Sequence, residues 1–345
     1  MPHNSPTRLS RRGLLTAGGV AAFGALLTAC GGSGGSGSSA KEGDGGGSWS
    51  FTDDRKKKVS AKSTPKRIVA FTGTAAALVD FGLDQQIVGV FGETKDKDGK
   101  AVPQAGDLNV DKVTVLGNAW GEFSIEKYAA LRPELLVTHM FNEGALWYVP
   151  DESKDKILGL GAPSVAIRTA RVPMTEPIKR YAELAESLGA DLKAKKVTDA
   201  KARFEAAAET LRKAAKASGG LKVMAASASP DLMYVSNPKS NSDLMYFAEL
   251  GVDLIVPEKL DEGGYFESLS WENAGKYKAD LILLDNRDGQ LQPKALADKP
   301  AWAELPAVKA NQITPWDSVP RFSYAGAAPL LENLAKAIQD AKKVS

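Results

Sequence analysis

The sequence has very little cysteine, histidine or surplus charge, and each shortage excludes a class of protein. One cysteine among 345 residues rules out internal disulfides and cysteine-rich metal sites. The two histidines, His3 and His139, are too few for a zinc or manganese site. The formal net charge is +2, and the N-terminal segment adds three arginines and no acid to that sum. A chain this close to neutral lacks the concentrated basic face that nucleic acid requires.

No apolar run is long enough to span a bilayer stably, but the N-terminus carries two targeting signals. The stretch SRRGLL at residues 10–15 resembles the twin-arginine export signal. The stretch LTAC at residues 27–30 resembles a bacterial lipobox, which predicts cleavage before Cys30 and its acylation, with palmitate as a candidate chain. We therefore expect residues 1–30 to be the signal of a lipoprotein held at the outer face of the cytoplasmic membrane.

Residues 31–48 are rich in glycine and serine, which predicts a flexible tether. The lone cysteine lies directly before this tether, so a buried structural role for it is a poor alternative. About 300 residues remain after the signal, enough for two α/β domains.

The stretch from residue 191 to 217 predicts a long helix. It contains no glycine or proline, and it is dominated by strong helix formers. Asp191 is a possible N-cap, and Gly219-Gly220 ends the run. Such a helix would be roughly 40 Å long. The residues alone leave two alternatives open, a surface helix inside one domain and a rigid strut that joins two lobes.

Apolar strand-like runs alternate with helix-like segments on both sides of this stretch. In residues 49–190 the predicted strands are 68–71, 87–91, 135–138 and 164–167. In residues 218–345 they are 221–226, 234–236, 279–285 and 311–315. Near-continuous apolar strands between helices predict a mostly parallel sheet covered on both faces in each lobe. The helix start at Ser124 and the following strand are repeated, in similar form, from Ser270 onward, which supports two similar lobes.

Several segments resemble one family of bacterial solute-binding proteins. These are PKRIVAFTGT, EFSIEKYAALRPELLV, LSWENAGKYKADLILL and WAELPAVKANQITPW, within a match from about residue 49 to 343. The family serves ATP-driven (ABC) importers of ferric siderophores, haem and cobalamin. More narrowly, the chain is similar to actinobacterial lipoproteins for ferric hydroxamates of the ferrioxamine type. The resemblance implies two lobes joined by one long α-helix, with a shallow cleft between them.

The resemblance also implies a partner and excludes a resident cofactor. One glutamate from each lobe is implied to dock on the membrane permease, and the matching positions are Glu126 and Glu272. A solvated acid favoured by the helix dipole is the alternative for each. The implied protein is a monomer that binds an iron(III)-siderophore complex as cargo and has no catalytic residues.

A siderophore supplies all the oxygen ligands of its iron, so the protein has to recognise the organic shell. Aromatic surfaces, hydrogen-bond donors and arginines suit that task. The candidates lie mostly after predicted strands, where ligands bind in such sheets. They are Trp120, Phe141, Trp147, Tyr148, Arg168, Ser227, Tyr234, Tyr265, Asn286, Arg287, Trp316, Arg321 and Tyr324. For each arginine, a surface ion pair is the alternative.

Two other functions stay open from the residues. Haem would need an axial ligand, for which His139 is the available histidine, and cobalamin is a ligand of the same family. A secreted hydrolase is the alternative of a different class. Ser236-Asn237-Pro238-Lys239 fits a Ser-x-x-Lys pattern, but its usual companion motifs are missing. The sequence therefore favours a binding protein over an enzyme.

Overall fold

The chain folds into two β-sheets that are covered by helices and linked by one long helix. The computed structural model describes residues 47–287 and 289–345. The predicted signal, Cys30 and nearly all of the tether lie outside these ranges. Within them, no helix combines the length and the apolar character needed to cross a lipid bilayer.

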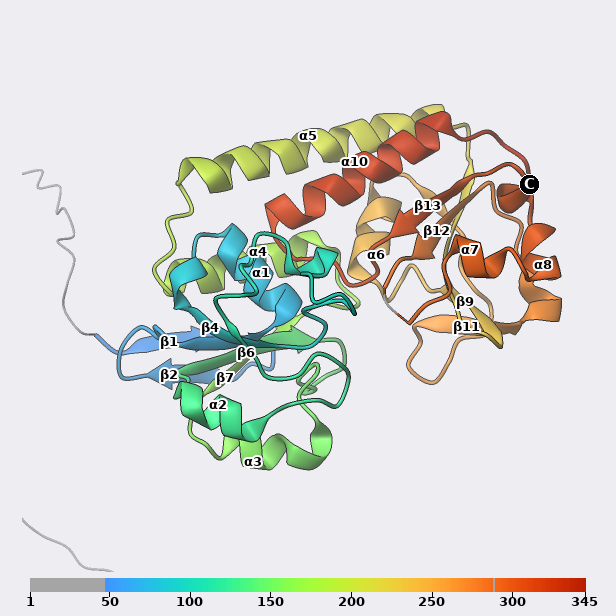
Figure 1. Ribbon diagram of the computed structural model, residues 1–345. Helices are drawn as coiled ribbons and strands as arrows, with labels where there is room; N and C mark the ends of the chain where they lie inside the picture. Colours follow the sequence, from blue (N-terminus) through green and yellow to red (C-terminus); the bar gives the residue numbers. More distant parts are fainter. Residues whose placement is uncertain (1–46, 288) are drawn as a thin grey trace, which may run out of the picture. The chain divides into compact units, whose positions relative to one another are not determined.

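The sheet of the first lobe has five parallel strands in the order β5-β4-β3-β6-β7. The strands are β3 (Ile68–Phe71), β4 (Ile87–Phe91), β5 (Thr114–Val115), β6 (Leu135–Met140) and β7 (Ser164–Arg168). The helices are α1 (Thr72–Asp80), α2 (Ile125–Leu131), α3 (Lys154–Leu158) and α4 (Thr175–Ser187), with short 3-10 turns at η1 (Asp84–Gln86), η2 (Pro103–Ala105) and η3 (Asp151–Ser153). Helices α1 and α4 lie on one face and α2 and α3 on the other (Figure 1). A hairpin of β1 (Trp49–Thr52) and β2 (Lys58–Ala61), which the sequence did not predict, precedes this sheet.

The second sheet is mixed, in the order β11-β9-β8-β12-β13, with β10 paired to β8. Its strands are β8 (Lys222–Ala228), β9 (Leu232–Ser236), β10 (Asp253–Leu254), β11 (Phe266–Ser270), β12 (Leu281–Asp285) and β13 (Ile313–Trp316). Its helices are α6 (Ser242–Glu249), η4 (Trp271–Lys276), α7 (Pro293–Leu296), α8 (Pro300–Ala303), α9 (Pro306–Lys309) and α10 (Tyr324–Asp340). Strands β8, β10, β12 and β13 pair in parallel, and β9 and β11 extend the sheet antiparallel. The predicted fold class, two α/β lobes with mostly parallel sheets, is confirmed.

The two copies of the sequence repeat fold differently at one point. Ser124 caps α2, since its Oγ accepts a hydrogen bond from the Lys127 amide at 3.3 Å. The corresponding segment of the second lobe is the 3-10 helix η4, and Ser270 does not cap it. The Ser270 hydroxyl accepts instead from the side chain of Asn273 at 2.9 Å.

The linking helix α5 (Lys195–Ala217) has 23 residues and a buried stripe that includes Val197, Phe204 and Leu211. Its rise gives a length of roughly 35 Å. It begins later than predicted, because the Asp191 carboxylate accepts from the Lys193 amide at 2.9 Å and forms a turn before the helix. Helix α5 lies alongside α10 (Figure 1).

One apolar core connects both lobes through α5 and α10. It contains Ile68 and Leu135 of the first sheet together with Val223 and Leu283 of the second. The outer face of each sheet has a separate cluster. Because close-packed interiors transmit strain and resist deformation, this shared core braces the lobes against each other.

Candidate functional site

A cavity of about 470 Å³ lies where residues at the carboxyl ends of strands in both lobes come together. Seven of the predicted ligand residues line it: Phe141, Trp147, Ser227, Tyr234, Tyr265, Arg287 and Trp316. Its volume falls within the range of small-molecule sites. The topological rule that ligands bind beyond strand ends therefore points to the same end of the sheets as this cavity.

The wall from the first lobe is aromatic. The ring centroids of Phe141 and Trp147 are 4.4 Å apart, and Trp120 contacts both Trp147 and Tyr148 at 4.9 Å. Trp120 itself is 65% exposed. Its turn is braced because the Asn118 side chain accepts from the backbone amides of residues 94 and 95. The wall is thus a preformed aromatic surface, one end of which faces solvent.

Tyr148 is held in a strained conformation at this wall. Its φ of 62° is unusual for a bulky residue, and such strain is often found at ligand sites. Its hydroxyl donates to Glu93 Oε1 at 3.0 Å. Burial, and then the Glu93 carboxylate, raise the pKa of Tyr148 well above its usual value. Gly92 makes room for this packing, since a Cβ there would lie 2.5 Å from the Phe71 ring.

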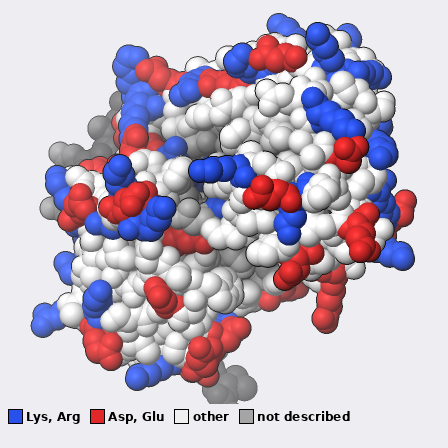
Figure 2. All heavy atoms as spheres, turned by 45° about the vertical axis from the view of Figure 1, so that its right-hand side comes forward, with Lys and Arg blue, Asp and Glu red and all other residues white. Residues whose placement is uncertain are grey.

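The charges of the cavity lining cancel. Among the residues that line it, Arg287 is the cation and Asp285 the anion, and their side chains form an ion pair at 2.7 Å. Asp285 is almost fully buried, at 1% exposure. On the face shown in Figure 2, basic and acidic side chains are interspersed. In the described ranges, no group of three or more His, Cys, Asp and Glu side chains is placed to hold a metal ion.

Trp316 is held in position by the buried carboxyl group of Asp243. Its indole Nε1 donates to Asp243 Oδ2 at 2.6 Å, and both residues are buried. Burial raises the pKa of Asp243 to about 7, although the bond to Trp316 opposes that shift. The position of this cavity residue therefore depends on a group that titrates near neutrality.

A smaller cavity adjoins the main one, and a third cavity adjoins the smaller one. The nearer, of about 230 Å³, shares Arg287 and adds Glu93, Asn286 and Asp317. Burial raises the pKa of Asp317 to about 6. The farther cavity shares Glu93 and includes Trp120. Two further predicted residues, Asn286 and Trp120, thus lie along this extension.

Six predicted residues do not line the main cavity. Asn286 and Trp120 line its extension, and Tyr148 packs against Phe71 and Trp120 in the aromatic wall. The other three are Arg168, Arg321 and Tyr324. Arg321 pairs with Asp80 of α1 at 2.9 Å. Its guanidinium packs so closely on Gly106 that a Cβ at this glycine would lie only 2.0 Å from Arg321 Nη1. Tyr324 packs against Phe81 and Phe204 in the shared core. Arg168, at the end of β7, donates its backbone amide to Asp54 at 2.8 Å. Arg321 and Tyr324 hold the lobes together in this structure.

Sequence reasoning missed part of the lining. The additional residues are Asn142, Ser229, Ser236, Asn241, Phe266, Asp285, Gln290, Ser318 and Val319. Asp285 and Ser318 lie at strand ends, so the signal that identified Arg287 could have found them. Three polar atoms of the lining, Trp147 Nε1, Gln290 Oε1 and Ser318 Oγ, are buried without a hydrogen-bond partner among the described residues. An unpaired buried polar group costs about 1–3 kcal/mol, so a ligand that pairs with these atoms after a small rotation is favoured.

His139 lies in the core of the first lobe and does not line the cavity. It is fully buried, and its Nδ1 is 2.6 Å from the Tyr181 hydroxyl and 3.2 Å from Thr74 Oγ1. Burial lowers the pKa of His139 to about 3. A neutral imidazole enclosed in this way is a packing residue, and it is not accessible to a haem iron or to a nucleophilic serine in the cavity.

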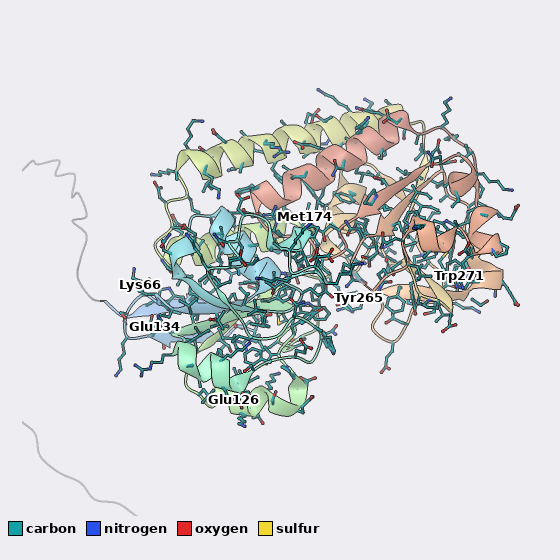
Figure 3. The ribbon with its side chains drawn as sticks, in the orientation of Figure 1. Lys66, Glu126, Glu134, Met174, Tyr265 and Trp271 are labelled. Atoms are coloured by element: carbon teal, nitrogen blue, oxygen red, sulfur yellow. The ribbon has the colours of Figure 1, made fainter. Side chains whose placement is uncertain are left out.

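Glu126 and Glu272 are both exposed, and each lies in the first turn of its helix. Figure 3 shows Glu126 on α2 of the first lobe and Trp271, the neighbour of Glu272, on the second. Helix η4 is anchored by Trp271, whose Nε1 donates to the Pro230 carbonyl at 3.0 Å. The repeated segment therefore presents an exposed glutamate at a helix start in both lobes.

Comparisons with known proteins identify the family to which this fold belongs. A family model described as periplasmic binding protein matches residues 68–320. The structure of DesE, a ferric-siderophore receptor protein from Streptomyces coelicolor, is 54% identical and has a TM-score of 0.82. That match covers 86% of this chain and 100% of DesE. No curated protein sequence matches the chain.

More distant structures share the fold alone. The petrobactin-binding protein YclQ from Bacillus subtilis is 20% identical with a TM-score of 0.61, over 85% of this chain and 98% of YclQ. The periplasmic heme-binding protein RhuT from Roseiflexus sp. RS-1 is 20% identical with a TM-score of 0.56, over 80% of this chain and 98% of RhuT. One architecture thus carries ligands of very different chemistry, so the ligand has to be argued from the cavity.

Proposed function

The chain belongs to the periplasmic binding protein family, and we propose that it captures an iron(III)-siderophore complex of the hydroxamate type, such as ferrioxamine. The observation that carries this proposal is the cavity between the lobes, whose rings come from both lobes and whose charges cancel. The similarity to DesE, a ferric-siderophore receptor, supports the same ligand class.

Charge favours a hydroxamate over a catecholate. Each hydroxamate carries a single negative charge, so three of them neutralise Fe(III), whereas three doubly charged catecholates leave a strongly anionic complex. An anionic complex needs unpaired cations, but Arg287, the cation among the lining residues, is paired with Asp285, and the adjoining cavity adds Glu93. Arg171, beside the cavity, has no carboxylate partner among the described residues, but its donors are engaged by the Gly263 carbonyl and the Tyr265 hydroxyl. A neutral or cationic complex meets no such electrostatic cost.

The aromatic wall and the unpaired polar atoms suit the organic shell of such a complex. Phe141 and Trp147 offer ring faces to its methylene chains. The indole N–H of Trp147 and the hydroxyl of Ser318 can donate to hydroxamate or amide oxygens. Arg168, Arg321 and Tyr324 are also proposed to contact the ligand. For that contact their side chains have to move from their present positions toward the cavity.

A ligand titration tests the proposal. Purified protein is titrated with ferrioxamine, a ferric tris-catecholate, haem and cobalamin, and binding is followed by calorimetry and tryptophan fluorescence. We expect stoichiometric binding of ferrioxamine with the strongest affinity. Preferential binding of the catecholate, haem or cobalamin would reject the hydroxamate assignment. Release of a hydrolysed product from any of them would favour the alternative of a hydrolase.

We further propose that Glu126 and Glu272 dock the loaded protein on the permease of an ABC importer. The supporting observation is that the repeated segment exposes its glutamate at the start of a helix in both lobes, Glu126 in α2 and Glu272 in η4. Alanine at both positions is expected to reduce iron uptake by cells while ligand affinity stays unchanged. Glu152, an exposed glutamate in the first turn of η3, provides the matched control variant. Equal uptake by the double variant and the control would exclude the docking role.

The predicted leader completes the proposal. Residues 1–30 act as a twin-arginine lipoprotein signal, Cys30 is acylated, and residues 31–48 tether the lobes, 49–190 and 218–345, to the outer face of the membrane as a monomer. Metabolic labelling with palmitate analogues checks the anchor, because Cys30→Ser is expected to abolish labelling and release the protein. The double substitution Arg11→Lys and Arg12→Lys is expected to block export.

A further inference from the structure

Arg171 joins the two lobes beside the cavity, and sequence reasoning did not identify it. It follows β7 in the first lobe and is exposed, with a left-handed φ of 58°. Its Nη2 donates to the Gly263 carbonyl of the second lobe at 2.5 Å. Its guanidinium carbon lies 4.8 Å from the centroid of the Tyr265 ring. One side chain of the first lobe thus holds a loop of the second.

Tyr265 completes this connection. Its hydroxyl donates to the Phe141 carbonyl at 2.8 Å and accepts from Arg171 Nη1 at 3.3 Å. Arg171 Nη1 also lies 3.5 Å from the same Phe141 carbonyl. Figure 3 shows Tyr265 on the side of the second lobe that is next to the first. Because Phe141 and Tyr265 both line the cavity, the connection spans its two walls.

The loop that Arg171 holds has internal hydrogen bonds. Asp261 Oδ1 accepts from the amides of Tyr265 at 2.6 Å and Phe266 at 2.9 Å. The Gly264 carbonyl accepts from the Asn237 side chain at 2.8 Å. These bonds connect the residues of segment 261–266, so the contact with Arg171 at Gly263 and Tyr265 bears on the whole segment.

Arg171 differs from the other arginines near the lobe boundary in its partners. Arg287 and Arg321 are ion-paired with Asp285 and Asp80. Arg171 has no carboxylate within ion-pair distance in the part of the chain that the structure describes, and it bonds to neutral oxygens instead. Its planar fork of donors, unlike a point charge, fixes the geometry of those oxygens.

We propose that Arg171 is a positioning residue that joins the loop 261–266 to Phe141 and thereby sets the width of the ligand cavity. The width in turn limits the size of the complex that the cavity accepts. The limit on ligand size rests on the proposed function, whereas the connection between the two cavity walls does not. The aromatic rings of Phe141 and Tyr265 contact the ligand, and Arg171 acts through them.

The test compares Arg171→Met with Arg132→Met. Arg132 is also an exposed arginine of the first lobe with a left-handed φ, of 45°, so the control carries the same backbone strain and loss of charge. Hydrogen–deuterium exchange of the ligand-free proteins reports on the segments 141–147 and 261–266. We expect Arg171→Met to speed exchange in both segments about tenfold, since hydrogen bonds from a charged donor are among the stronger ones. Arg132→Met should leave both segments unchanged.

Ligand selectivity supplies the second readout. The affinities for ferrioxamine and for the bulkier ferrichrome are measured for each protein. The preference for ferrioxamine over ferrichrome, expressed as the ratio of the two affinities, is expected to fall about threefold or more in Arg171→Met only. Tyr265→Phe should act in the same direction, and the double variant should be less than additive because the two side chains share one connection.

Each outcome decides a separate point. Unchanged exchange in Arg171→Met would overturn the proposal. Faster exchange with an unchanged affinity ratio would overturn the role in setting the width. If the wild-type protein binds neither complex, the proposed function fails, and the exchange data alone decide whether Arg171 joins the walls.

Discussion

The two lobes bury titratable groups of opposite kinds. The first lobe encloses a base, His139, against Tyr181, and burial lowers the pKa of that histidine to about 3. The second lobe encloses an acid, Asp243, against Trp316, and burial raises the pKa of that carboxyl to about 7. Each group is pushed toward its neutral form by the cost of burying charge. Acid should therefore weaken the first lobe and favour the second.

The lobes also contribute differently to the cavity. The first lobe provides uncharged side chains, mainly the rings of Phe141 and Trp147, whereas the second provides the ion pair of Asp285 and Arg287. Only in the second lobe is a cavity residue, Trp316, bonded to a group that titrates near neutrality. The first lobe thus contributes no charge to the cavity lining, whereas the second contributes both charges and most of the polar side chains.

The largest expected effect concerns His139. The unfolded chain takes up a proton below the ordinary pKa of 6.5, but the folded protein does not until about pH 3. This histidine therefore makes stability fall as the pH drops from 6.5 toward 3, at up to about 1.4 kcal/mol per pH unit. His139→Gln should remove that dependence, as measured by urea unfolding at pH 7, 5 and 4. Parallel pH curves for the two proteins would contradict the placement of a neutral histidine in the core.

Asp243 should produce the opposite slope. The folded pKa of about 7 exceeds the ordinary 3.8, so the folded state binds the extra proton between these values. The contribution is fully present below pH 3.8 and is lost as the pH rises through 7, by up to about 4 kcal/mol in total. Asp243→Asn keeps an oxygen acceptor for Trp316 and removes the titration. The variant should gain stability over wild type when the pH is raised from 4 to 8, and an unchanged difference would refute this account.

The aromatic wall gives the third comparison. Trp147→Ala should weaken ferrioxamine binding by about 2–3 kcal/mol, or roughly 30–150-fold, because central buried aromatic residues dominate binding energy. Tyr234→Ala in the second lobe should cost less, since Tyr234 packs edge-on against Phe266 at the other wall and its hydroxyl is already paired with Ser229. Calorimetry measures both affinities. Equal losses would show that the lobes share the apolar contacts.

The smallest effect concerns the contact between α5 and α10. Arg203 donates two hydrogen bonds to Glu332, at 2.7 and 2.6 Å, but both side chains are well exposed. Glu332→Gln should cost about 0.5–1 kcal/mol of stability in urea unfolding, since exposed pairs are screened. Exchange in both lobes should hardly change, because the shared core supplies the bracing. A large loss would assign that role to the ion pair instead.

The sequence determined the elements and the end of the sheets at which the site lies. Continuous apolar strands, helix formers between them and the run at 191–217 predict a buried sheet in each lobe and a long helix, because these patterns depend on local chain chemistry. The same rule placed Phe141 and Arg287 beyond strand ends.

Only the tertiary structure decided which of these residues meet in the cavity. Arg321 and Arg287 look alike in sequence, yet Arg321 pairs with Asp80 across the lobes and Arg287 lines the site. Arg171 lay outside every sequence pattern, because its partners are carbonyl and hydroxyl oxygens that are more than 25 residues away along the chain. Partner choice depends on how two folded sheets pack together, and the local chain does not encode that directly.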